Sequence, residues 1–106
     1  MTSPKRFRYT DVPSLIQGDV PADEAWCYLS GLHTNIEFHH IMNGTFREKS
    51  EKYGCWVWLN STVHHKLHHT PEGKQWGRSL KAKCQLAFEN KYSRELWMRE
   101  FKKSYL

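Results

Sequence analysis

The feature of this sequence that most constrains its fold is the placement of its histidines. The stretch STVHHKLHHT, residues 61–70, contains four of the seven histidines, and a second pair lies upstream at His39 and His40. His64 and His68 are four residues apart, and on a helix this spacing places both imidazoles on one face. Two histidines in this geometry can bind a single metal ion, so we expect a helix here.

The segments around the histidines predict two strands. Apolar and polar side chains alternate in NIEFHHI, residues 35–41, and CWVWLN, residues 55–60, is rich in β-branched and aromatic residues. Residues 42–54 predict a polar, charged loop with room for a helical turn. Adjacent strand residues point to opposite sides, so one histidine of the pair can bind metal while the other faces a different partner. Ser61 or Thr62 is expected to cap the following helix, and Pro71 to end or bend it.

The C-terminal part of the chain predicts two further helices. Near 74–90 one helical face is apolar, and polar residues that include Arg78, Lys81 and Gln85 occupy the opposite positions. Ser93 is expected to cap a last helix with an apolar side of Leu96, Trp97 and Phe101. The order of strand, loop, strand and three helices predicts an α+β fold.

The first 24 residues differ from the rest of the chain. Residues 1–24 contain three of the four prolines and are expected to form an irregular basic arm, followed by a single domain over 25–106. The arm carries Lys5, Arg6 and Arg8, which we expect in a solvated tail, with phosphate contact as the alternative.

Composition limits the class of protein. The 106 residues are 39% hydrophobic and 14% aromatic, which is enough for one packed core. No apolar run is long enough to span a bilayer, and the N-terminus lacks the apolar segment of a secretory signal. The net charge of +5 favours a polyanionic partner. The cysteines do not have the spacing of a disulfide framework, so a cytoplasmic protein is expected; they are Cys27, Cys55 and Cys84.

At EFHHIMNG and CWVWLNSTVHHKLHH, about residues 36–69, the sequence resembles the core of the HNH nucleases, also called ββα-metal or His-Me finger nucleases. Residues 26–106 are also similar to small phage-encoded HNH-like proteins, in which SEKYG precedes the second strand and the chain closes on text like NKYSRELWMREFKKSYL. The resemblance implies a ββα-metal core, a hairpin plus a helix, followed by two C-terminal helices.

The resemblance also implies roles for individual residues. His39, His64 and His68 correspond to the ligands of one divalent ion, which could be Zn²⁺, Mg²⁺, Mn²⁺ or Ni²⁺. His40 corresponds to the general base that activates water, while the ion offsets charge on the phosphate and the leaving oxygen. His65 and His69 are expected to be exposed. Flanking phosphates of DNA could be held by Arg47, Lys49, Lys52 and Lys66.

Two features depart from the family pattern. By spacing, Cys55 stands where the family has an asparagine that steadies the loop carrying the base, and a thiol is a poor substitute for an amide. Asn43 and Asn60 are the candidates to replace it. Of the four thiols of the usual structural zinc only Cys27 remains, so we expect no structural zinc; the other three positions are Ser30, Asn60 and Val63.

Three functional hypotheses follow. The first is a phage-type HNH endonuclease that hydrolyses DNA phosphodiester bonds with a divalent metal. The second, favoured by Cys55, is a catalytically weakened HNH-fold protein that binds DNA, or a phage or host protein such as a nuclease or defence component, without cutting. The third is a metal-binding or sensing module that never touches nucleic acid, and the positive net charge argues against it.

Overall fold

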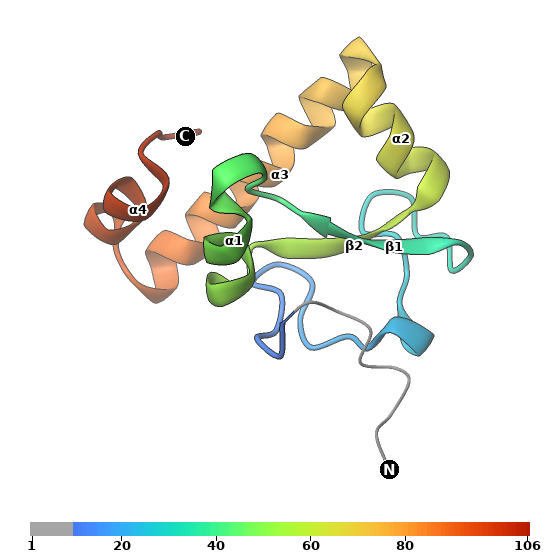
Figure 1. The fold of residues 1–106 in the computed structure, drawn as a ribbon, viewed down its shortest axis with the longest axis horizontal. Helices are drawn as coiled ribbons and strands as arrows, with labels where there is room; N and C mark the ends of the chain where they lie inside the picture. Colours follow the sequence, from blue (N-terminus) through green and yellow to red (C-terminus); the bar gives the residue numbers. More distant parts are fainter. Residues whose placement is uncertain (1–9) are drawn as a thin grey trace.

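The structure is a computed structural model that describes residues 10–106, so Lys5, Arg6 and Arg8 of the predicted arm lie outside the described residues. Its centre is an antiparallel hairpin of β1 (Ile36–His40) and β2 (Trp56–Asn60), which confirms both predicted strands. In the register of the hairpin His39 lies opposite Val57 and His40 lies opposite Trp56. Four α-helices accompany the hairpin in the described chain, and the α+β class is confirmed (Figure 1).

The connection between the strands is more helical than the loop that the sequence predicts. It contains a 3₁₀ turn, Gly44–Phe46, and α1 (Arg47–Tyr53). Gly54 ends α1 with φ +78, and a Cβ there would lie 2.3 Å from the backbone oxygen of Pro13. Only glycine meets both requirements, the left-handed conformation and the close approach, so this residue sets where α1 stops and β2 begins.

Two helices follow β2 with almost no linker, α2 (Ser61–His69) and α3 (Pro71–Lys91). The prediction that Ser61 or Thr62 caps α2 is wrong, because the Asn60 side chain accepts hydrogen bonds from the backbone N–H groups of the next turn. The predicted break at Pro71 is confirmed. Proline there also opens α3, since its fixed φ suits the first helical position, and the Thr70 hydroxyl caps that helix.

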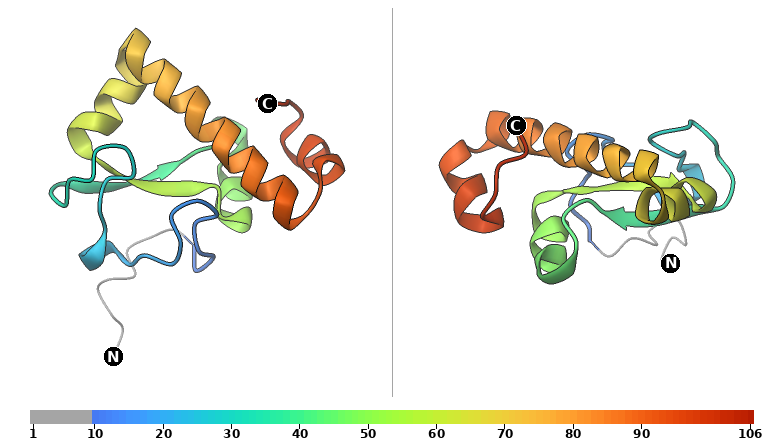
Figure 2. Two further views of the ribbon diagram at one scale, coloured as in Figure 1. Left: turned by 180° about the vertical axis from the view of Figure 1, so that it is seen from behind. Right: turned by 90° about the horizontal axis from the view of Figure 1, so that it is seen from above.

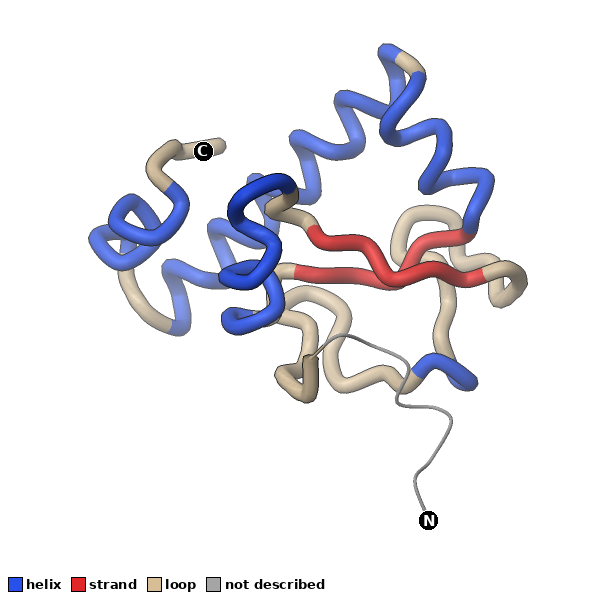
Figure 3. Tube along the Cα trace, viewed as in Figure 1, coloured by secondary structure: helices blue, strands red, loops and turns tan. Residues whose placement is uncertain are grey.

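The hairpin has a different apolar layer on each face. Val57 and Leu59 on one face pack against α2 and α3, whereas Phe38, Trp56 and Trp58 on the other face lie under the irregular N-terminal segment. The indole N–H groups of both tryptophans donate to carbonyls of that segment, at 2.9 and 2.7 Å. Figure 3 shows the strands between the helices and the loops of this segment.

The last helix, α4 (Arg94–Phe101), closes the helical side of the core. Ser93 caps it, and Trp97 and Phe101 are buried, as the sequence predicts. The placement of Gln85 on the exposed face of α3 is wrong, because it is fully buried and its side-chain oxygen accepts the Tyr105 N–H at 2.6 Å. Figure 2 shows the chain turning back after α4. Within residues 10–106, no helix combines the length and the apolar character that a membrane crossing requires.

Candidate metal centre

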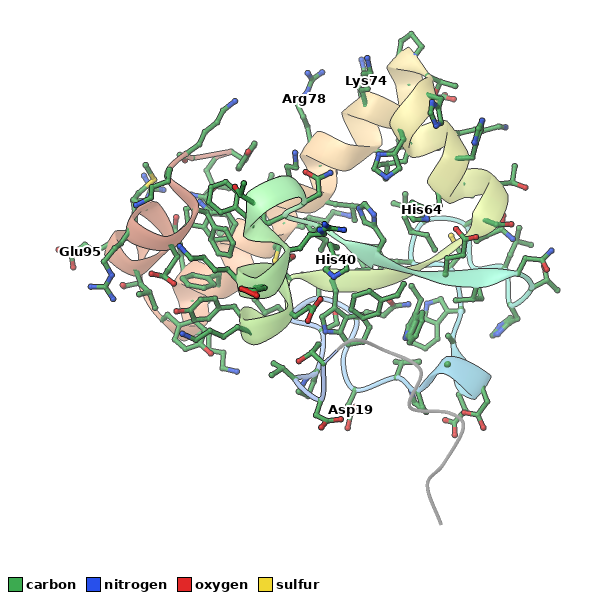
Figure 4. All side chains as sticks on the ribbon, viewed as in Figure 1. Asp19, His40, His64, Lys74, Arg78 and Glu95 are labelled. Atoms are coloured by element: carbon green, nitrogen blue, oxygen red, sulfur yellow. The ribbon has the colours of Figure 1, made fainter. Side chains whose placement is uncertain are left out.

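Three of the predicted functional histidines converge between the hairpin and α2. His39 comes from β1, and His64 and His68 come from successive turns of α2. Each offers a ring nitrogen, and these nitrogens all lie within 4.8 Å of one another. The sequence-based prediction that these residues are close enough to share a metal ion is therefore confirmed. Figure 4 shows His64 on α2 above the strands.

The geometry of this histidine triad fits a small four-coordinate cation. A tetrahedral zinc with Zn–N bonds of about 2.0–2.1 Å holds its nitrogens about 3.3 Å apart. Nδ1 of His39 and Nε2 of His64 are 3.2 Å apart, which is close to that spacing. His68 is the exposed member of the triad, and its ring nitrogen lies within 4.8 Å of those of the other two histidines. Three protein ligands leave one coordination position for water or substrate.

A carboxylate fixes the ligand atom of His64. Glu37 Oε1 lies 2.8 Å from His64 Nδ1, which places the proton on that nitrogen and leaves the lone pair on Nε2, toward His39. Glu37 precedes His39 by two residues, so strand periodicity places both on the same face of the hairpin. Sequence reasoning missed Glu37, although this period-two spacing was available to find it.

Two rings of the triad, those of His39 and His68, have lowered pKa values. Burial, followed by the positive charge of neighbouring His64 and His68, lowers the pKa of His39 to about 3. The ring of His68 is exposed but partly desolvated by its neighbours, and this desolvation, followed by the charge of His64, also lowers the pKa of His68. At neutral pH both rings are therefore neutral and keep a lone pair for a metal ion.

A cavity of about 280 Å³ opens beside the triad. Its lining includes His39 and His68 from the triad and three cationic side chains of α3, Lys74, Arg78 and Lys81. The remaining lining is neutral: Ile41, Asn43, Leu67 and Gly77. Burial, and then the charge of Lys103, lowers the pKa of Lys81. The sequence assigned Arg78 and Lys81 to the polar face of the helix, but it could not show that this face meets the histidines.

His40 lies on the opposite face of the hairpin from the triad. Its ring is 5.0 Å from that of Phe38, and its Nε2 lies 2.7 Å from Glu51 Oε2 on α1. A second cavity of about 470 Å³ adjoins it, lined also by Arg47 and Glu48. Contact with a carboxylate holds the proton on Nε2 and leaves Nδ1 as the basic nitrogen. Nothing in the local sequence indicates Glu51, because its position depends on how α1 packs against the strand.

Cys55 lies in the core, next to Trp56, the residue that pairs with His40. It is fully buried, and its thiol contacts Cys84 of α3, which together with burial raises the pKa of Cys84. The cysteines of the described chain are free thiols, and all three are buried. The backbone of Cys55 nevertheless bonds to the loop after His40, since its carbonyl accepts the Ile41 N–H at 2.9 Å.

Ser50 holds the loop that follows the histidine pair. Its hydroxyl accepts the Met42 N–H at 3.1 Å and donates to the Cys55 carbonyl. Ser50 therefore steadies this loop from α1, which is the task that the sequence assigned to Asn43 or Asn60. Asn60 instead caps α2 and donates to the Thr34 carbonyl at 2.7 Å, and Asn43 is exposed at the cavity beside the triad.

Of the four basic residues predicted to bind phosphate, three lie on α1 and the fourth, Lys66, lies on α2. Arg47 lines the second cavity, and Lys66 is exposed on α2. Lys49 donates to the Glu100 carbonyl at 3.1 Å, and Lys52 lies 5.2 Å from the ring centre of Tyr53. His65 and His69 are exposed, as expected.

Comparison of the chain with protein-family models, with curated proteins and with solved structures found no match in any of the three.

Proposed function

We propose that this protein is a metal-dependent endonuclease of the HNH type, which hydrolyses DNA phosphodiester bonds. The observation that carries the proposal is the convergence of His39, His64 and His68 on one point next to a cavity lined by cations. A divalent ion bound there would polarise the phosphate and stabilise the leaving oxygen. The net charge of +5 favours a polyanionic substrate.

His40 supplies the general base in this proposal. The Glu51 carboxylate orients its ring and fixes its tautomer, so that Nδ1 can accept a proton from water. His40 is the last residue of β1, at one end of the hairpin. In this proposal the phosphodiester binds beside the triad, and His40 activates the attacking water at this end of the strand.

A plasmid-nicking assay tests the proposal. Supercoiled plasmid is incubated with wild type and His40→Ala in the presence of Mg²⁺, Mn²⁺, Zn²⁺ or Ni²⁺. Wild type is expected to convert it to the open-circular or linear form with at least one ion. His40→Ala is expected to lose about 10²–10⁴-fold in rate, the usual contribution of a general base. His33→Ala is the control, because His33 is exposed and lies outside the site.

Two results would contradict the nuclease proposal. If neither protein cleaves DNA with any ion, the activity is absent. If His40→Ala cleaves at the wild-type rate, His40 is not the base. Zinc affinity measured on the same variants separates a lost base from a lost metal site, since none of the three ligands is changed in His40→Ala.

A second candidate function is metal-dependent binding without cleavage, to DNA or to a phage or host protein. The position of His40 favours it, because the ring contacts Glu51 and Phe38 on the face opposite the triad. In that case the triad retains its metal and the protein binds its target, but the nicking assay gives no product.

A further inference from the structure

The cavity beside the triad is unusual in its charge. Three of its lining residues are cationic and none is acidic. Within residues 10–106, no carboxylate forms an ion pair with Lys74, Arg78 or Lys81. Lys81 is half-buried, with the Tyr105 ring 5.3 Å from its ammonium. Cations that converge without a carboxylate create a positive potential that an anionic ligand can neutralise.

The second cavity has the opposite character. Beside His40 it contains one cation, Arg47, and two carboxylates, Glu48 and Glu51. Phosphate oxygens approaching there would meet like charge from both carboxylates. The charge of the two cavity linings therefore favours the surface of α3 over that of α1 as the one that binds a polynucleotide backbone.

The three cations also form a continuous row. Positions 74, 78 and 81 are four and three residues apart, so they share one face of α3 and span about 10 Å along its axis. Figure 4 shows Lys74 and Arg78 extending side by side from the N-terminal half of the helix. Lys81 lines the same cavity as His39 and His68 of the triad. The row therefore runs from Lys81, beside the triad, to the exposed residues Arg78 and Lys74.

We propose that this face of α3, defined by Lys74, Arg78 and Lys81, binds the phosphate backbone of DNA on one side of the metal centre. The inference rests on the proposed function for its choice of DNA. In this proposal the main phosphate contact is made by this face of α3 and not by the basic residues of α1. A length of about 10 Å can accompany two or three phosphates, since one strand of a duplex carries a phosphate about every 3.4 Å along the axis.

The test compares two double variants that remove the same charge from different helices. Lys74→Gln with Arg78→Gln neutralises two exposed residues of α3, and Arg47→Gln with Lys52→Gln neutralises two exposed residues of α1. Lys81 is left unchanged because it is half-buried and lines the cavity beside His39 and His68. Binding of a short fluorescein-labelled DNA duplex is measured by anisotropy between about 50 and 200 mM salt, without metal, so that no cleavage interferes.

The α3 variant is expected to lose affinity and to reduce the slope of log K against log salt by about two, while the α1 variant changes it by less than one. Equal slopes for the two variants, a larger effect of the α1 variant, or no DNA binding by wild type would overturn the inference. So would competition by polyglutamate as strong as that by DNA, because the face would then bind any polyanion. The nicking assay is independent: an α3 variant that binds and nicks DNA as wild type does refutes this inference but leaves the nuclease proposal standing.

Discussion

Glu37 and His64 are joined by a contact of 2.8 Å between the carboxylate oxygen and Nδ1 of the ring. This contact determines which nitrogen of His64 carries a lone pair, and that nitrogen faces His39 at 3.2 Å. Glu37 is itself half exposed, so the contact does little for the core. In the proposed metal site its effect would be to orient the ring of His64, as outer partners of metal-binding histidines commonly do.

Replacement of this carboxylate should weaken metal binding without unfolding the protein. We expect Glu37→Ala to reduce zinc affinity by about 10–100-fold, because the ring of His64 loses the partner that fixes its tautomer and orientation. Isothermal titration with Zn²⁺ measures the affinity, and the melting temperature of the metal-free variant should stay near that of wild type. Glu95→Ala on α4 is the control, since Figure 4 places it at the far side of the molecule from His64. Equal zinc affinity for Glu37→Ala and wild type would show that the contact has no orienting role.

The identity of the preferred ion follows from the ligands. Three imidazoles that lie close enough to share one ion suit Zn²⁺ better than Mg²⁺ or Mn²⁺, which favour oxygen ligands. We expect Zn²⁺ to bind most tightly of the ions tested, and His64→Ala to lose at least about 100-fold in affinity, more than the loss of an outer partner costs. His65→Ala is the matched control, because it is the neighbouring exposed histidine on the same helix. Unchanged zinc affinity in His64→Ala would exclude it as a ligand.

Sequence reasoning was most successful where chemistry and periodicity coincide. The four-residue spacing of His64 and His68 has one interpretation on a helix, and alternation along a strand places His39 toward that helix. The same alternation places His40 on the other face, as the sequence predicts for adjacent strand residues. Local patterns therefore sufficed for the hairpin, for the three helices after it and for the shared face of His64 and His68, whereas the choice of His39 as their partner came from the family resemblance.

Contacts made by tertiary packing were not predictable in the same way. Gln85 has a polar side chain at a position that the helical period marks as exposed, but the C-terminal residues fold back and use its amide. Ser50 holds the loop after the histidine pair only because α1 packs against the strand. Asn60 ends one strand and caps the next helix, and a sequence that offers Ser61 and Thr62 beside it gives no means to choose among them.

The stability of the metal-free protein should depend on pH through His39. Its pKa is lowered to about 3 in the folded state, against 6.5 for the unfolded chain, so the unfolded state binds more protons between these values. The free energy of unfolding should therefore fall as pH decreases from about 6 to about 4, by up to about 1.4 kcal/mol per pH unit from this residue. Above pH 6.5 the contribution is constant.

Urea unfolding at a series of pH values, with a chelator present, measures this dependence. His39→Gln should flatten the slope, although His68, whose pKa is also lowered, leaves a residual dependence of the same sign. His33→Gln is the control, because that side chain is exposed in the folded state. A slope for His39→Gln equal to that of wild type would show that His39 accepts a proton as readily in the folded protein as in the unfolded chain.

The corner between α2 and α3 offers a matched pair of glycines. A Cβ added to Gly73 would lie 1.9 Å from the Lys66 carbonyl oxygen, whereas one added to Gly77 meets only the Leu67 side chain, at 3.6 Å. Both glycines lie within α3, where alanine is favoured over glycine by about 1 kcal/mol. Gly77→Ala should therefore raise the free energy of unfolding by up to about 1 kcal/mol, and Gly73→Ala should lower it by about 2 kcal/mol or more, because backbone must move.

Thermal and urea unfolding of the two variants measure this difference. Addition of Zn²⁺ should raise the melting temperature of both, since a ligand that binds only the folded state stabilises it and all three ligands are retained. If Gly73→Ala is as stable as Gly77→Ala, the backbone at this corner can move far enough to admit a Cβ that would otherwise lie 1.9 Å from the Lys66 carbonyl oxygen. The angle at this corner would then be adjustable, and with it the distance between the histidines on α2 and the cationic row on α3.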